Sequence, residues 1–196
     1  MTTKKDKLPR WDLKDLYHDP ASKKLDFDFK KCRRDANAFH KRYFGKIAEL
    51  SGDELVGAVQ LYEKIDQLIA RMMSYAQLCH STDVLSTEIS RFYQTTQETL
   101  TEISAQLVFF KIELNQLDDE ALKAKLTSSK LKNYSSWIRD LRMFRPHVLK
   151  EEMERLLQDK RNAGQGAWVR LFDETMARMR IEVDNQHKTV EEALHD

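Results

Sequence analysis

The amino-acid sequence predicts a mainly α-helical protein, built as a long antiparallel helical hairpin within a multi-helix bundle. Only 5 glycines and 3 prolines occur among 196 residues, which leaves few turns and disfavours many short strands. Apolar residues also recur three and four positions apart over segments far longer than a strand. Helices of that length with one apolar stripe need neighbours, so a bundle follows.

The first long helix is predicted from about Ser22 or Asp26 to Tyr43, where Gly45 can end it. Its apolar stripe consists of Leu25, Phe29, Cys32, Ala36, Phe39 and Tyr43. The preceding cluster from Trp11 to Tyr17 is too short for a long helix. We expect it to dock on the body as a turn or a short helix.

Two longer helices form the predicted hairpin. The segment from Ser51 to Glu54 has the pattern of a capping box and opens a helix over about residues 53–80. Ser86 opens the next, which is predicted to run to about Gln116. At 1.5 Å per residue each is roughly 40 Å long. Their apolar stripes are Leu55, Val59, Tyr62, Ile65, Leu68, Met72, Tyr75, Ala76 and Cys79, then Ile89, Phe92, Tyr93, Thr96, Leu100, Ile103, Leu107, Phe110 and Leu114.

Shorter helices are predicted next, over residues 118–126, 131–143, 149–162 and 167–180, with a break at Pro146. Gly164 is expected to end a helix in a left-handed conformation and allow the next to start. The lack of a following Lys and Ser/Thr excludes a phosphate loop at Gly164-Gln-Gly166.

The last residues predict a possible β-hairpin followed by a helix start. Residues 180–183 alternate like a strand, with a turn at 184–186. Residues 189–192 form a second capping box, whose helix is cut off at Asp196. We therefore expect three parts: an N-terminal arm and docking segment over 1–20, with 1–10 flexible, a helical lobe over 21–183, and the start of a truncated following segment over 184–196.

Composition and charge narrow the function classes. Lys and Arg number 33 against 32 Asp and Glu, so no one-sided basic footprint favours nucleic-acid binding. The basic start has no apolar run behind it, unlike a secretory signal. No segment approaches the ~18 consecutive apolar residues of a membrane span. The two cysteines fall in different predicted helices, and a cytoplasmic location with reduced thiols is expected.

Several residue groups could be taken for sites, and each has a structural interpretation that we prefer. His147 and Glu151 could face one way on a helix, but a zinc site needs about three protein ligands, so we favour helix capping. The Asp118-Asp119-Glu120 trio could be a carboxylate cluster, but a helix N-terminus explains it better. The run from Lys30 to Arg34 is interpreted as a solvated face, since an anion site would need further basic residues.

Thiol and apolar candidates are also interpreted structurally. Cys79 and His80 are adjacent and diverge on a helix, so we expect a buried thiol beside an exposed histidine and no nucleophile–base pair. The methionines Met72, Met73, Met176 and Met179 are expected to fill the core. The aromatic residues Tyr134, Trp137, Phe144, Trp168 and Phe172 lie on helical stripes and are predicted to be core as well.

Four segments, in order along the chain, resemble the oligoendopeptidase F family, which are zinc metallopeptidases related to thimet oligopeptidase. The most informative is RPHVLKEEMERLLQDKRNAGQGAWVRLFD, over residues 145–173. The other three are LPRWDLKDLY at 8–17, MSYA at 73–76 and QLVFFKIEL at 106–114.

The resemblance implies the N-terminal, non-catalytic lobe of a two-lobed peptidase that hydrolyses short peptides, with this lobe walling the substrate cleft. The family's His-Glu-x-x-His motif is absent from this sequence, so no catalytic or metal residue can be carried over. We therefore expect the chain alone to be inactive and to hold no cofactor. Zinc and oligopeptide substrate are expected in a parent with a C-terminal catalytic domain. The alternatives left open are a stand-alone helical protein-interaction module and, less favoured, a homo-oligomeric bundle.

Overall fold

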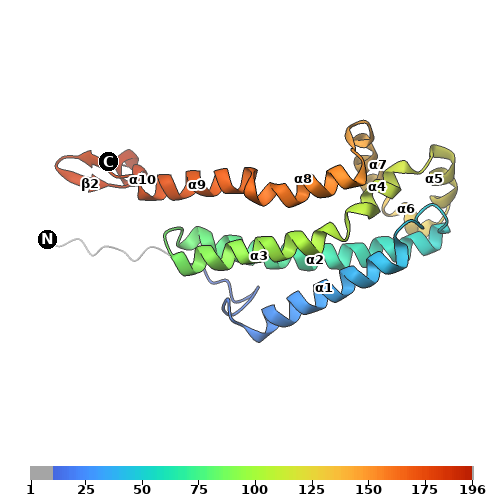
Figure 1. Cartoon of the computed structure of the whole chain (residues 1–196), viewed down its shortest axis with the longest axis horizontal. Helices are drawn as coiled ribbons and strands as arrows, with labels where there is room; N and C mark the ends of the chain where they lie inside the picture. The colour runs from blue at the N-terminus through green and yellow to red at the C-terminus, as the bar shows by residue number, and fades with distance from the viewer. Residues whose placement is uncertain (1–10, 196) are drawn as a thin grey trace.

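The structure is a computed structural model that describes residues 11–195, and it is mainly helical as predicted (Figure 1). The predicted flexible arm, and residues 8–10 of the family-like opening, lie outside the described residues. In chain order the elements are α1 (Lys23–Tyr43), α2 (Gly52–Thr82), α3 (Thr87–Ala105), α4 (Val108–Gln116), α5 (Asp119–Lys125), α6 (Ser129–Lys132), α7 (Ser135–Met143), the 3-10 turn η1 (Arg145–His147), α8 (Glu151–Ala163), α9 (Gln165–Arg178), β1 (Ile181–Val183), β2 (Gln186–Lys188) and α10 (Val190–His195).

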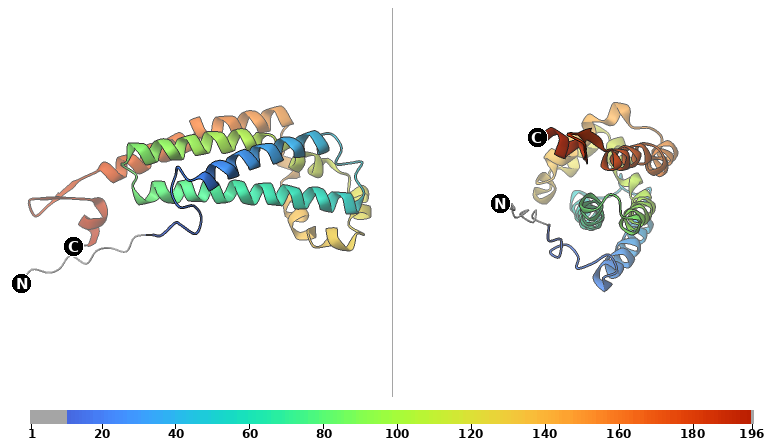
Figure 2. Two further views of the ribbon diagram at one scale, coloured as in Figure 1. Left: turned by 90° about the horizontal axis from the view of Figure 1, so that it is seen from below. Right: turned by 90° about the vertical axis from the view of Figure 1, so that its left-hand side faces the viewer.

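The long helices lie in three layers (Figure 2). Viewed along the molecule, α1 lies on one side of the α2–α3 hairpin, and α8 and α9 lie on the other. The predicted antiparallel hairpin is thus confirmed. No helix among residues 11–195 combines the length and apolar character needed to cross a membrane.

Side-chain caps fix the starts of the long helices. The side chain of Ser22 accepts from the backbone N–H of Leu25, which fixes the start of α1. At Ser51 the capping box is complete: its hydroxyl accepts from the Glu54 N–H, and the Glu54 carboxylate accepts from the Ser51 N–H at 2.8 Å. Local sequence therefore sets where these helices begin.

The core lies between α1 and the hairpin, and Phe39 is at its centre. This side chain is fully buried, and its ring packs against Tyr62, Phe109 and Phe110 at centroid distances of 5.2–6.2 Å. Phe109 and Phe110 are neighbours in sequence, and both are buried because α4 is surrounded by other elements. The body formed by α1–α7 thus has a closed core.

Two predicted helices are interrupted. The helix expected to reach Gln116 breaks at Gln106-Leu107, where backbone bonds of the 3-10 type close a turn before α4. That break rotates α4 so that it can bury residues on more than one side. The helix expected over 131–143 is likewise broken at Asn133-Tyr134, between α6 and α7. Phe144, predicted as core, is 65% exposed at the turn that Pro146 enforces.

The segment before α1 docks on the body as predicted. Tyr17 is buried and donates its hydroxyl to Asp28 at 2.9 Å, while the Arg71 guanidinium binds the carbonyls of Asp15 and Leu16. Burial and the bond to Asp28 raise the pKa of Tyr17 above its ordinary value. Trp11, in contrast, is 65% exposed.

The chain returns along α3 as a nearly continuous rod made of α8 and α9 (Figure 1). Gly164 joins the two helices with φ −97° and ψ −107°, so the predicted left-handed glycine is wrong at this joint. Beyond the rod, β1 and β2 form the expected antiparallel hairpin, with left-handed Asp184 and Asn185 at its turn. The second capping box, Thr189 with Glu192, opens α10 as predicted.

Candidate functional site

The outer face of the α8–α9 rod is a stripe of apolar side chains that no element among residues 11–195 covers. We define the outer face by its exposed apolar residues, which are Met153, Leu156, Leu157, Trp168, Val169, Leu171 and Phe172. Trp168 is 73% exposed and Phe172 is 63% exposed, so the prediction that these two belong to the core is wrong. Met179 is also exposed, which contradicts its interpretation as core filler.

The reason for this exposure is that the rod turns polar side chains toward the body. Asn162 donates to the hydroxyl of Thr101 on α3 at 2.9 Å, and Arg170 reaches Gln97 at 3.4 Å. A cavity of about 500 Å³ between α3 and the rod is lined mostly by polar residues. The apolar stripe therefore lies on the side of the rod away from α3. Contiguous exposed apolar patches of this kind mark interaction surfaces.

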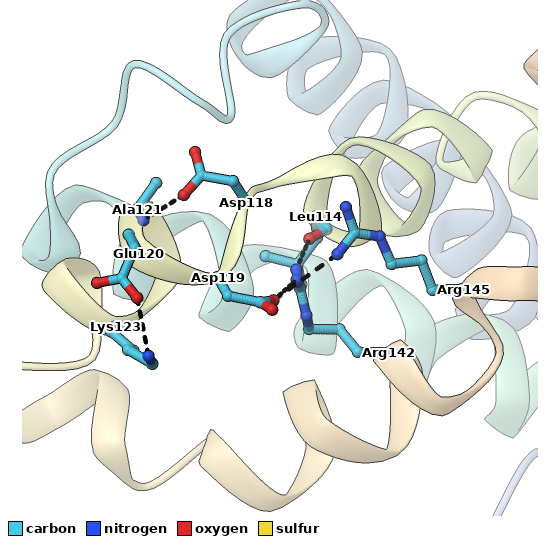
Figure 3. Close-up of polar contacts among 8 residues, drawn as sticks. All are labelled: Leu114, Asp118, Asp119, Glu120, Ala121, Lys123, Arg142 and Arg145. Carbon is cyan, nitrogen blue, oxygen red and sulfur yellow. Dashed lines mark hydrogen bonds and ion pairs between the residues drawn. The ribbon is translucent and has the colours of Figure 1, made fainter.

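Asp119 of the acidic trio links α5 to the segment that leads into the rod (Figure 3). The Asp118 carboxylate accepts from the Ala121 N–H at 2.8 Å, so it caps α5 as predicted. Asp119 accepts from Arg142 at 2.5 Å and lies 3.7 Å from Arg145, which ties α5 to the turn ahead of α8. The Asp118 carboxylate thus caps a helix and the Asp119 carboxylate forms ion pairs, so these two groups do not form a carboxylate dyad.

A second concave feature lies where α8 passes over α2 and α4. Its volume is about 590 Å³. Tyr62, Leu107 and Ile112 are buried residues that line it, and burial raises the pKa of Tyr62. Asn115 also lines it and is only 3% exposed; its side-chain oxygen has no hydrogen-bond partner among the described residues. An unpaired buried acceptor costs about 1–3 kcal/mol. Sequence reasoning missed this site, because a lone Asn in an apolar segment carries no spacing signal.

His147 and Glu151, which the sequence analysis assigned to helix capping rather than to a metal site, lie in two different elements. His147 lies in the exposed turn η1, and Glu151 opens α8. Within residues 11–195 no group of three His, Cys, Asp or Glu side chains is arranged to hold a metal ion. Glu151 in the first turn of α8 fits the capping interpretation, since carboxylates are favoured at helix N-termini.

Cys79 and His80 are both buried, so the prediction of an exposed histidine is wrong. The His80 ring stacks on Tyr93 with a centroid distance of 4.8 Å, which holds it at the α2–α3 contact. Burial raises the pKa of the Cys79 thiol, which disfavours the thiolate that a nucleophile needs.

The basic run on α1 is a solvated face, as predicted. Its exposed cations pair with nearby acids: Lys30 with Asp26, Lys31 with Asp35, and Arg33 with Glu102. Cys32 within the run is fully buried. The run therefore offers its charges to neighbours on the protein, and each exposed pair contributes little to stability.

Comparisons with known proteins address the resemblance directly. A family model described as Oligopeptidase F matches residues 113–181, which include the whole rod. Oligopeptidase PepF of Bacillus subtilis (strain 168) is 25% identical over 150 residues, covering 76% of this chain and 22% of that protein. The crystal structure of oligoendopeptidase-F from Enterococcus faecium superimposes with a TM-score of 0.75 at 18% identity, over 88% of this chain and 34% of that one.

The fold and these matches make the chain similar to a helical region of oligopeptidase F-type proteins. The resemblance to the N-terminal region of the oligoendopeptidase F family is confirmed. The chain spans only about a fifth to a third of the length of the relatives it matches.

Proposed function

We propose that this chain serves as the N-terminal, non-catalytic lobe of an oligoendopeptidase F-like zinc metallopeptidase. In this proposal the lobe comprises residues 21–183, walls one side of the substrate cleft, and works in the cytoplasm. The parent hydrolyses short peptides with a zinc-activated water. In this proposal the zinc ligands belong to the catalytic part of the parent.

The single observation that carries the proposal is the outer face. The family model matches the segment that contains it, and the polar inner side of the rod leaves its apolar stripe without a partner in the part of the chain that the structure describes. Burying apolar surface yields about 25 cal/mol per Å². We infer that the catalytic part of the parent covers this face and that the contact holds the two lobes together.

Two experiments test the proposal. The reading frame beyond residue 196 should continue into a His-Glu-x-x-His motif; a stop codon there favours a stand-alone interaction module. The purified chain, given zinc and a quenched oligopeptide, should show no cleavage. Turnover that a chelator abolishes contradicts the non-catalytic role.

A further inference from the structure

We propose that the cavity between α2, α4 and α8 binds the carboxyl end of a short peptide with an apolar terminal side chain. The apolar side chain lies on the floor, the last peptide group meets Asn115, and the carboxylate meets Lys111 and Arg161. This inference goes beyond the proposed function, because it requires neither zinc nor a catalytic part.

The floor of the cavity suits an apolar side chain. Tyr62, Leu107 and Ile112 are at most 8% exposed and form its buried apolar lining, which we call the floor, and the half-buried Leu141 also lines the cavity. The volume of about 590 Å³ lies within the range of small-molecule sites. Concave sites with an apolar floor and a few polar groups are the usual form of such sites.

Asn115 supplies the polar group that selects a peptide. Three buried side-chain atoms lack a partner among the described residues: Arg71 Nε, His80 Nε2 and Asn115 Oδ1. Arg71 already binds two carbonyls, and His80 stacks on Tyr93. Asn115 lines the cavity, and its amide offers both a donor and an acceptor, which is the complement of a peptide group.

The rim supplies cations for a carboxylate. Lys111 and Arg161 line the cavity and pair with no carboxylate in the part of the chain that the structure describes. The Lys111 ammonium lies 5.7 Å from the centre of the Tyr62 ring.

Two acids also line the cavity, and both have contacts of their own. Glu154 accepts from the Leu149 N–H at 2.9 Å, and Asp66 interacts with Tyr62. The lining therefore carries charges of both signs, and Lys111 and Arg161 are cations in it that can pair with a ligand carboxylate. Guanidinium and ammonium groups bond carboxylates more strongly than neutral donors do.

The test is an NMR titration of the ¹⁵N-labelled chain with N-acetyl-alanyl-leucine. The expected result is a saturable shift of the Asn115 side-chain amide. The same peptide as its C-terminal amide, which lacks the charge, and hexanoate, which lacks the peptide group, should each bind about tenfold more weakly. Equal binding of all three probes, or no saturable shift, overturns the proposal.

Variants locate the binding. Asn115→Leu and Arg161→Gln should each weaken binding about tenfold, whereas Arg155→Gln, an exposed change on α8 outside the cavity lining, should leave it unchanged. Circular dichroism verifies folding. Arg161→Gln alters an exposed side chain and keeps the test decisive if Asn115→Leu fails to fold. Binding that neither variant weakens contradicts this site. Because no cleavage is measured, either result leaves the peptidase proposal standing.

Discussion

The body formed by α1–α7 and the rod formed by α8–α9 carry the same kind of sequence pattern and use it in opposite ways. In the body, apolar stripes face each other around the fully buried Phe39. In the rod, the stripe that includes Trp168 and Phe172 faces outward, while Asn162 and Arg170 meet the body. Periodicity therefore predicts that a helix is amphipathic, but it does not say whether the partner of its apolar face lies in the same chain.

The largest expected contrast comes from removing one phenylalanine in each region. Phe39→Ala should lower the free energy of unfolding by about 3–5 kcal/mol, because it leaves a cavity among packed rings. Phe172→Ala should change it by no more than about 0.5 kcal/mol, because the ring is already in water. Urea titration followed by circular dichroism measures both. A large loss for Phe172→Ala would mean that the outer face is covered in the isolated chain.

Alkaline pH should weaken the body through Cys32. Burial raises the pKa of this thiol from 9.0 to about 11, so the native state favours the neutral form. The stabilisation is complete below pH 9 and is lost as pH rises toward 11, by about 3 kcal/mol in total. Unfolding free energies between pH 8 and 11 measure the slope. The unfolding free energy of Cys32→Ala should fall less steeply with pH between pH 9 and 10. An unchanged slope would mean that other groups cause the loss.

Removal of the capping box should have an intermediate effect. Ser51→Ala deletes the acceptor for the Glu54 N–H and should cost about 1 kcal/mol. Thr189→Ala removes the same type of cap from α10, outside the body, and we expect little change in the global unfolding transition. Thermal denaturation compares the two, and equal losses would show that α10 unfolds together with the body.

The smallest effect on stability is expected from charging the outer face. The double variant Trp168→Glu, Phe172→Glu should leave the unfolding free energy within about 0.5 kcal/mol of the wild type. It should nevertheless lower the binding of an apolar fluorescent dye, because it breaks the exposed patch. Dye binding that stays at the wild-type level would locate the apolar surface elsewhere.

Sequence reasoning predicted what depends on local chemistry. The caps at Ser51 and Asp118, the helix start near Ser22 and the β-hairpin near residue 184 are where their side chains and backbone preferences require them. It failed where tertiary packing decides. The break at Gln106-Leu107 serves the burial of α4, and His80 is buried because Tyr93 from the next helix stacks on it.

The candidate sites divide in the same way. The outer face was visible as a stripe in the sequence, but its exposure depends on how α8 and α9 rotate against α3. The cavity beside Asn115 joins residues from five helices, α2, α3, α4, α7 and α8, and no local pattern marks it.

In the proposed function, the remainder of a longer peptidase covers the outer face. Hydroxyl-radical labelling of Trp168, Phe172 and Met153 measures it most directly, in this chain alone and in the longer protein encoded by its uninterrupted reading frame. If the catalytic part covers the outer face, all three residues should be strongly oxidised in the isolated chain and strongly protected in the longer protein. The exposed Trp11 should be equally oxidised in both. Equal oxidation of the three residues in the two samples would contradict it.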